Sequence, residues 1–322
     1  MLNAHVMGYP RAMTVRSREP GFYHYISRCV RSAWLCGEDP VSGRNFNHRR
    51  DWIERRLVDL AQTFAVGLYA WAAMNNHTHG VLHVDPRLPH SWDDEEVAAR
   101  WSRLRHTLDG PADPEVATAR KQILLKQPER LAEIRDRLGS LSWFMRFLNE
   151  SIARTANAED QCTGRFWEGR FRCQALLDDA AVLACMAYVD LNPIRAGLCD
   201  RLINSDFTTI QRRLRSLESG PNRGRGRLEP VTGFGESEDA PEISLADYVD
   251  LVEWTGRIAR PDKFGMIVDK QPPVTTIRGS PGWWARCSLT IEAAFGCAVG
   301  RPARLKAHAE ATGRRSMRGM SA

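Results

Sequence analysis

The residues in this chain with the clearest chemical potential are two histidines that stand two positions apart, His77 and His79. They open the segment from His77 to Asp85, which we expect to form a strand because it is rich in β-branched and apolar residues. Side chains at positions i and i+2 of a strand point to the same face, so both imidazoles can reach one metal ion. The alternative for an isolated His-x-His is a pair of polar residues on a solvated strand face.

A second pair, Tyr188 and Asn192, stands four positions apart in a predicted helix, so both side chains share one face of it. If this face lies against the histidine strand, two imidazoles and the Asn192 amide oxygen could hold a metal with Tyr188 beside it. Such ligands suit a divalent ion such as Mn²⁺ or Mg²⁺, which would polarise a phosphate. Without the histidines, the pair would be a packing tyrosine and an asparagine near a helix end.

The chemistry open to Tyr188 is nucleophilic attack on a phosphodiester. A tyrosine phenol has a pKa of about 10, so it is a weak nucleophile until it is activated or aimed. Attack on DNA would form a phosphotyrosine link and free the neighbouring sugar hydroxyl. A sugar hydroxyl could later reverse the step, so strands would be exchanged without a high-energy cofactor.

Between the two pairs lies a stretch, residues 164–172, in which arginines alternate with aromatic residues. Aromatic rings stack on unpaired bases and arginines hold the backbone, which makes this stretch a candidate contact for single-stranded DNA. The alternative is a loop pinned into the core by its aromatic side chains. Arg195, beyond the predicted tyrosine helix, could grip a phosphate or bond a helix carbonyl. The candidate nucleic-acid-binding residues are therefore Arg165, Phe166, Trp167, Arg170, Arg172 and Arg195.

Periodicity and turn residues predict the elements that must position these side chains. Apolar positions spaced as in a helix run from Asn47 to Phe64 and from Leu141 to Ala156. Asn75 and Asn76 form a turn signal between two predicted strands, because Asn tolerates left-handed backbone angles. Asp178 and Asp179 suit the N-terminus of the tyrosine helix, which runs from Ala180 to about Leu191 before Pro193 limits it. The predicted strands are Phe22–Val30, Val66–Met74, His77–Asp85 and Arg172–Leu176.

The domain organisation follows from changes in composition. We expect a flexible N-terminus at residues 1–20 and a main domain at 21–200 that contains a helical insertion at 86–138. The insertion is a solvated helical excursion or, as the alternative, a clamp that faces DNA. A basic segment and Gly/Pro-rich linker at 201–242 lead to a helical C-terminal region at 243–322.

Composition limits the class of protein. The chain has 322 residues, 43% of them hydrophobic, and a formal net charge of +6, so it can bury a sizeable core. Arginine carries most of the positive charge, and a modest basic excess is compatible with nucleic-acid binding. The eight cysteines form no C-x-x-C pair. Without an apolar leader or a membrane-spanning run, these scattered thiols predict a cytoplasmic protein.

Three motifs in this order resemble those of a known family. They are His77-Thr78-His79 in a predicted hairpin, Arg165-Phe166-Trp167-Glu168, and the run Tyr-Val-Asp-Leu-Asn-Pro-Ile-Arg-Ala-Gly that begins at Tyr188. Over roughly residues 20–200 the chain resembles the single-tyrosine HUH transposases, and most of all their REP-associated tyrosine transposase branch. The resemblance implies an α+β protein with a ferredoxin-like antiparallel sheet, the HUH fold.

The resemblance also implies roles for individual residues. Tyr188 would be the nucleophile that becomes linked to a 5′ end of DNA, His77 and His79 would be metal ligands, and Asn192 would be the third ligand. The substrate would be single-stranded DNA, often with hairpins beside the cut, handled by a monomer or a homodimer. Thr78 departs from the family pattern, which has a bulky hydrophobic residue between the histidines; threonine suits a strand, so we expect little loss.

The sequence therefore predicts a metal-dependent transposase that cleaves and rejoins single-stranded DNA through a 5′-phosphotyrosine. The alternative is a regulator that binds DNA hairpins without cutting and retains the fold. A metallohydrolase is a weaker alternative, because Gly80, Val81 and Leu82 follow His79 where a His-x-His-x-Asp-His pattern would place further ligands.

Overall fold

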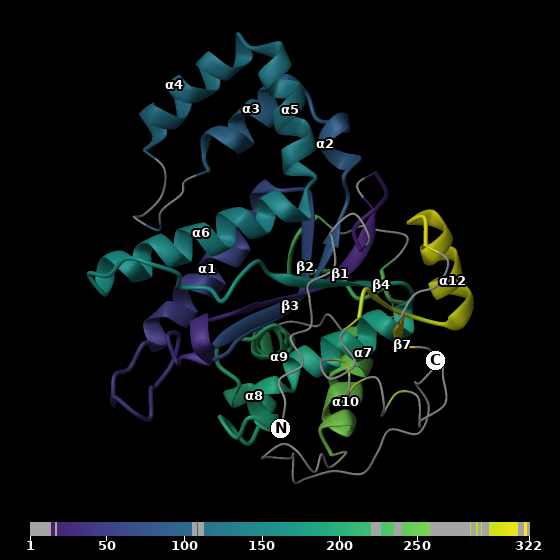
Figure 1. The fold of residues 1–322 in the computed structure, drawn as a ribbon. Coiled ribbons are helices and arrows are strands. Elements are labelled where there is room, and N and C mark those ends of the chain that lie inside the picture. Colours follow the sequence, from purple (N-terminus) through teal and green to yellow (C-terminus); the bar gives the residue numbers. More distant parts are fainter. Residues whose placement is uncertain are drawn as a thin grey trace.

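An α+β architecture built on a single mixed sheet positions the candidate residues (Figure 1). The computed structural model describes residues 14–16, 18–104, 108, 113–219, 227–234, 240–257, 284, 288, 291, 296–314 and 319–320. The sequence-based expectations for residues 1–13 and for most of the segment 258–295 lie outside this described part. Within it, no helix combines the length and the hydropathy needed to cross a membrane.

The sheet has the strand order β5-β2-β3-β1-β4-β6-β7 in the described part of the chain. Neighbours from β5 to β4 are antiparallel, whereas β4–β6 and β6–β7 are parallel. The four strands of the main domain pair antiparallel, as expected, and strands from the C-terminal region extend one edge of the sheet in parallel, so the sheet as a whole is mixed. The strands are β1 Gly21–Arg28, β2 Val66–Ala73, β3 His77–Val84, β4 Arg172–Leu176, β5 Thr232–Gly233, β6 Ala298–Val299 and β7 Gly319–Met320.

The turn between β2 and β3 is held from outside the hairpin. The Met74 amide donates to the His77 carbonyl across the turn at 2.8 Å. The amides of Cys29 and Cys36 donate to the carbonyls of Asn76 and Asn75, at 2.9 and 2.8 Å. These bonds fix the start of β3, so the first candidate histidine has a defined place.

Helices cover the two faces of the sheet with different partners (Figure 1). Helices α1 (Asn47–Thr63) and α6 (Leu141–Glu159) lie on one face and share one apolar cluster with it. On the opposite face, α7 (Asp179–Asp190), α9 (Thr209–Ser219) and α10 (Leu245–Gly256) lie together. The predicted helices are confirmed for α1, α6, α7 and α10, whereas α9 forms within the segment 201–242 that was expected to be a basic segment and linker. The tyrosine helix lies on the second face.

The segment between β3 and α6 is helical, as predicted, and extends away from the sheet (Figure 1). Its longer helices pack on one another, and the Arg100 guanidinium donates to the Gln62 carbonyl at 2.6 Å while lying over the Trp92 ring. Arg100 is thus engaged in packing this segment onto the end of α1. The other helices that the described residues form are α2 Leu88–Ser91, α3 Asp94–Ser102, α4 Pro114–Leu125, α5 Pro128–Leu138, α8 Asn192–Arg195 and α12 Pro302–Ala311, with short 3-10 turns at Val30–Ser32 and Leu202–Asn204.

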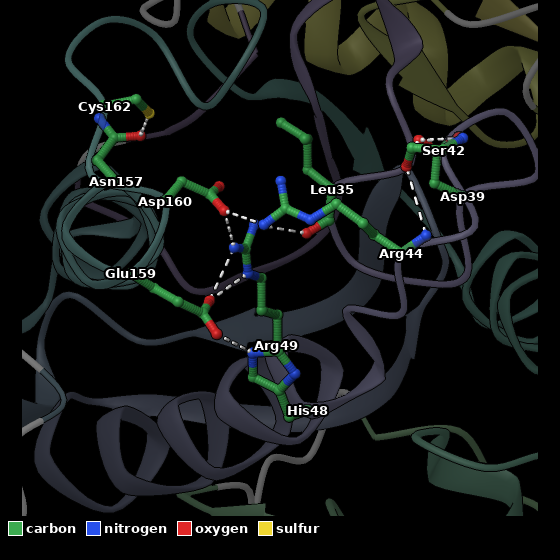
Figure 2. Close-up of polar contacts among 10 residues, drawn as sticks. All are labelled: Leu35, Asp39, Ser42, Arg44, His48, Arg49, Asn157, Glu159, Asp160 and Cys162. Atoms are coloured by element: carbon green, nitrogen blue, oxygen red, sulfur yellow. Dashed lines mark hydrogen bonds and ion pairs between the residues drawn. The ribbon is translucent and has the colours of Figure 1, made fainter.

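A buried guanidinium ties α1 to the end of α6 (Figure 2). The Arg49 side chain has no exposed surface, and it donates to Glu159 and Asp160 at 2.8 Å each and to the Leu35 carbonyl at 3.2 Å. Its guanidinium also lies over the Phe46 ring, 4.2 Å from the centroid. Arg49 therefore fixes the segment that in turn holds the β2–β3 turn through Cys36.

We predict that Arg49→Met lowers the free energy of unfolding by about 2–4 kcal/mol, because it leaves partly buried carboxylates without their counter-charge. Arg44→Met is the matched control: Arg44 also pairs with Asp160, but its side chain is 62% exposed. It should cost less than about 1 kcal/mol. Urea denaturation of the two variants measures both values, and equal losses would contradict the assignment.

Candidate active site

Strand β3 presents both candidate histidines on the face that α7 covers. His77 lies opposite Arg28 and His79 opposite Ile26 in β1. Their ring centres are 5.3 Å apart. The Nδ1 atom of His77 lies 2.8 Å from the Asn76 side-chain oxygen. A bond from an Nδ1–H group to this oxygen would leave the lone pair of the neutral ring on Nε2.

The spacing of the two rings fits shared coordination of one ion. Imidazoles that bind one metal through bonds of about 2.1 Å have ring centres about 4.5–5.5 Å apart for ordinary ligand angles. Within the described residues, no group of three or more His, Cys, Asp or Glu side chains forms a metal site. A metal on His77 and His79 would thus need an amide oxygen or solvent as a further ligand.

Helix α7 brings Tyr188 against this pair. The helix begins where expected, because the Asp178 side chain accepts from the Ala181 amide at 3.0 Å. Its last turn places the Tyr188 ring edge-on to the His79 ring, with centroids 5.6 Å apart and planes at 84°. Residues from β3 and α7 that are distant in sequence are therefore neighbours, as the predicted site requires.

Asn192 is the first residue of α8, one turn beyond Tyr188. The amides of Arg195 and Ala196 donate to the carbonyls of Leu191 and Asn192, so helical geometry continues past the end of α7. The Asn192 side chain is buried. Its part as a third ligand stays a prediction.

A third histidine, which the sequence analysis did not single out, completes the group. The His24 ring of β1 lies 5.9 Å from the His79 ring and 6.3 Å from the Tyr188 ring. His24 lies opposite Gln174 of β4, whose amide nitrogen is 2.8 Å from His24 Nδ1. A bond donated by the Gln174 amide to Nδ1 would place the proton of the neutral His24 ring on Nε2. The sequence shows only that His24 shares one face of the predicted strand β1 with Ile26. The strand order, which places β1 beside β3, makes His24 a diagonal neighbour of His79.

Three of these four side chains are closed to solvent, whereas His77, at the start of β3, is half-buried. His24 has no exposed surface, and Tyr188 and His79 are each 1% exposed. The Tyr188 phenol is therefore part of the packing between α7 and the sheet.

A buried polar network braces the end of α7 from the C-terminal region. The Tyr248 hydroxyl of α10 donates to Asp190 at 2.6 Å. Arg213 of α9 donates to the carbonyls of Tyr69 and Glu229 and lies over the Tyr248 ring. Burial raises the pKa of Asp190 to about 7. No motif pointed to this network, which couples α7 to residues beyond the resemblance.

The arginine–aromatic stretch divides into buried rings and exposed cations. Phe166 and Trp167 are buried against each other, with ring centres 4.8 Å apart. The Trp167 indole N–H donates to the Asn149 carbonyl at 2.8 Å. This arrangement is that of a loop pinned into the core, so these two rings are not free to stack on bases. Arg165 and Arg170 point outward and are exposed.

The other two candidate arginines are less available. Arg172 begins β4 and is half-buried. Arg195 is buried, and its guanidinium donates to the Ser288 carbonyl at 2.9 Å. Arg195 thus makes the carbonyl bond that was the alternative to phosphate binding.

We predict that Asp190→Asn weakens the pH dependence of stability between pH 4 and 8. The folded-state pKa of Asp190 lies above the ordinary value of 3.8, so the stability it contributes is fully present below about pH 4 and is lost as pH rises through 7. The asparagine has no such transition, and the difference between the two curves should reach at most about 4 kcal/mol. Urea denaturation across this range measures it. Parallel curves for the two proteins would contradict a raised pKa.

Comparison with known proteins gives one structural match and no match to a family model or a curated protein. No protein-family model matches the chain, and no curated protein matches it. A solved structure of a REP-associated tyrosine transposase bound to a REP hairpin is similar over 74% of this chain and 99% of that chain. The identity is 12% and the TM-score is 0.37, so the match establishes neither family nor function.

Proposed function

We propose that the protein is a metal-dependent DNA strand transferase that cleaves and rejoins single-stranded DNA, with Tyr188 as the nucleophile. The observation that carries the proposal is the packing of Tyr188 against His79, 5.6 Å between ring centres, with His77 on the same face of β3. The expected substrate is single-stranded DNA with hairpin-bearing repeats. A monomer or a homodimer would act on it.

The connection of the central elements supports the proposal. The order β1-α1-β2-β3-α6-β4 in sequence, with β2-β3-β1-β4 across the sheet, follows the ferredoxin-like pattern. In this arrangement, the histidine strand lies in the middle of the sheet. We interpret β1 to β4 with α1 and α6 as the ferredoxin-like, HUH-type unit, and the added strands β5 to β7 as extensions of it.

The residues present fit a divalent ion, Mg²⁺ or Mn²⁺. His77 would bind it through Nε2, the atom its bond to Asn76 leaves with a lone pair, and His79 and the Asn192 amide oxygen would complete the protein ligands. Bound there, the ion would withdraw charge from the oxygens of the scissile phosphate.

Tyr188 would form a bond from its phenolic oxygen to phosphorus while the bond from phosphorus to the 3′ oxygen breaks. The 3′ oxygen leaves with a proton, and the phenol loses one. His24, whose ring centre lies 6.3 Å from that of Tyr188 and 5.9 Å from that of His79, would orient the site, and solvent would take the proton. Attack by a free 3′ hydroxyl on the phosphotyrosine reverses the step and joins a new strand.

Replacement of the nucleophile tests the reaction class. Incubated with Mn²⁺ and a single-stranded DNA that carries a hairpin, the wild type should form a covalent adduct seen on a denaturing gel, and Tyr188→Phe should form none. Tyr23→Phe is the control, since that tyrosine is buried in β1 on the opposite face. An adduct that survives in Tyr188→Phe would refute the assignment of the nucleophile.

Metal affinity tests the ligands without any reaction. His77→Ala should weaken Mn²⁺ binding, measured by the loss of the free-ion electron paramagnetic resonance signal, by about tenfold or more. His48→Ala removes a histidine from the surface of α1, where it pairs with Glu159, and should leave affinity unchanged. Equal Mn²⁺ affinity in the wild type and in His77→Ala would contradict a metal site at His77.

The alternative function is a DNA-hairpin-binding regulator that does not cut. The burial of Tyr188 and His79 favours it, because a packing tyrosine has the same surroundings. A regulator would bind the hairpin equally well as wild type and as Tyr188→Phe, and would form no adduct with any metal.

A further inference from the structure

An open groove runs between α6 and the loop that joins α6 to β4. Its volume is about 780 Å³, within the roughly 300–1,000 Å³ of ligand sites. One wall is the α6 surface around Trp143, Arg146 and Asn149, and the other is the loop from Arg165 to Phe171. We call this the α6 groove. It lies apart from the buried group around Tyr188, on the side of the sheet that α6 covers.

Two cations of the groove have no counter-charge. Arg165 and Arg170 are exposed, and no carboxylate in the described parts of the chain lies within ion-pair distance of either. A pair of uncompensated guanidinium groups at one groove is the arrangement that binds phosphates, because each presents a planar fork of donors.

A third guanidinium is held in place at the opposite wall. Arg146 is exposed and lies over the Trp143 ring, 4.9 Å from the centroid. The carboxylate that lines the groove, Glu150, is already paired with Arg146 and Arg154, at 3.4 and 2.5 Å. The lining therefore keeps a positive excess, with Arg146 placed at the wall opposite Arg165 and Arg170.

The inner surface of the groove is aromatic. Trp143, Trp167 and Phe171 line it, and the indole N–H of Trp167 is already used by Asn149. Trp167 and Phe171 are buried and Trp143 is half-buried, so unpaired bases would lie mainly against the exposed guanidinium planes while phosphates take the positive charge. A fully paired duplex has no free base faces to offer.

The groove is linked to the histidine strand through the backbone. The Glu168 amide donates to the Arg28 carbonyl at 2.8 Å, and Cys29 forms a β-bridge with Trp167. Arg28 lies directly opposite His77. The loop wall and His77 are thus at the same end of the sheet.

We propose that the α6 groove binds the unpaired strand of the DNA substrate next to the segment to be cut, with phosphates on Arg165 and Arg170. This inference rests on the proposed DNA substrate, but it concerns a surface that takes no part in the bond-breaking step. It makes the loop at 164–171 a site of strand binding through its exposed arginines.

Binding is best measured where cleavage cannot occur. In a Tyr188→Phe background, fluorescence anisotropy would follow a labelled hairpin with a single-stranded flank, a matched hairpin without the flank, and a blunt duplex. Arg165→Gln/Arg170→Gln should weaken binding of the flanked hairpin about tenfold or more. The slope of log affinity against log salt should fall by about 1.4 for two lost single-strand phosphate contacts. Binding of the blunt duplex should not change.

A second variant blocks the groove without altering charge. A Cβ atom added at Gly169 meets no atom within 4 Å, and the backbone there lies outside the left-handed region, so Gly169→Phe adds bulk to the groove lining without backbone strain. It should also weaken binding of the flanked hairpin only. Arg55→Gln/Arg130→Gln removes the same charge from exposed positions on α1 and α5 and should have little effect.

The outcomes separate this inference from the proposed function. Unchanged affinity in both groove variants would overturn it, whether or not the wild type forms an adduct. Equal weakening of the control variant, or displacement of the flank by an acidic peptide at similar affinity, would also overturn it in favour of a general anion surface. Selective loss together with no wild-type adduct would support the groove and refute the strand transferase.

Discussion

The close contact of β3 with the strands on both sides is the constraint on which the rest of the structure depends. A Cβ atom at Gly80 would lie 2.4 Å from the Ala70 carbonyl oxygen and 2.9 Å from the Tyr25 ring, so a glycine is needed directly after His79. A slip of one residue would bring a larger side chain into this space and turn His77 and His79 to the other face. The packing around Gly80 therefore decides which side of the sheet carries the candidate site.

Because this register fixes which side chains of β3 point to which side, the two faces of the sheet carry different features. On one face, the rings of His24, His79 and Tyr188 are packed beneath α7, and the end of α7 is held by Asp190 and Tyr248. On the other face, α1 and α6 form a rigid layer that Arg49 joins, and the outer surface of α6 borders the open groove. The candidate site and the α6 groove thus lie on opposite faces at the same end of the sheet, where Arg28 lies opposite His77.

The local elements could be predicted from sequence because their signals are local. The runs of β-branched and apolar residues and the Asn75–Asn76 turn signal predicted the hairpin, and the Asp178 cap predicted the start of α7. The meeting of Tyr188 with the histidines followed only from the family resemblance, since periodicity does not fix which helix covers which face. The structure agrees with that expectation.

The features that the sequence did not predict depend on how distant segments pack together. His24 became part of the site because β1 lies between β3 and β4, and no local pattern carries strand order. The short strands β5 to β7 have two residues each, too few for a period to show. The stretch at 164–172 carried signals for both stacking and packing, and burial separated Phe166 and Trp167 from the exposed Arg165 and Arg170.

The closed site and the open groove together set an order of events for the proposed reaction. Tyr188 is buried where α7 packs on β3, whereas Arg165 and Arg170 are already accessible, so a DNA strand meets the groove first. Binding there can favour an open position of α7 only if the strand makes further contacts that exist in the open form alone, since a ligand shifts an equilibrium by no more than its differential affinity. Those contacts are the ones between the scissile phosphate and the group around His79. The hydrogen bond from Tyr248 to Asp190 would oppose a movement of α7 away from β3. The C-terminal region, which carries Tyr248, would therefore raise the binding energy that is needed to expose Tyr188.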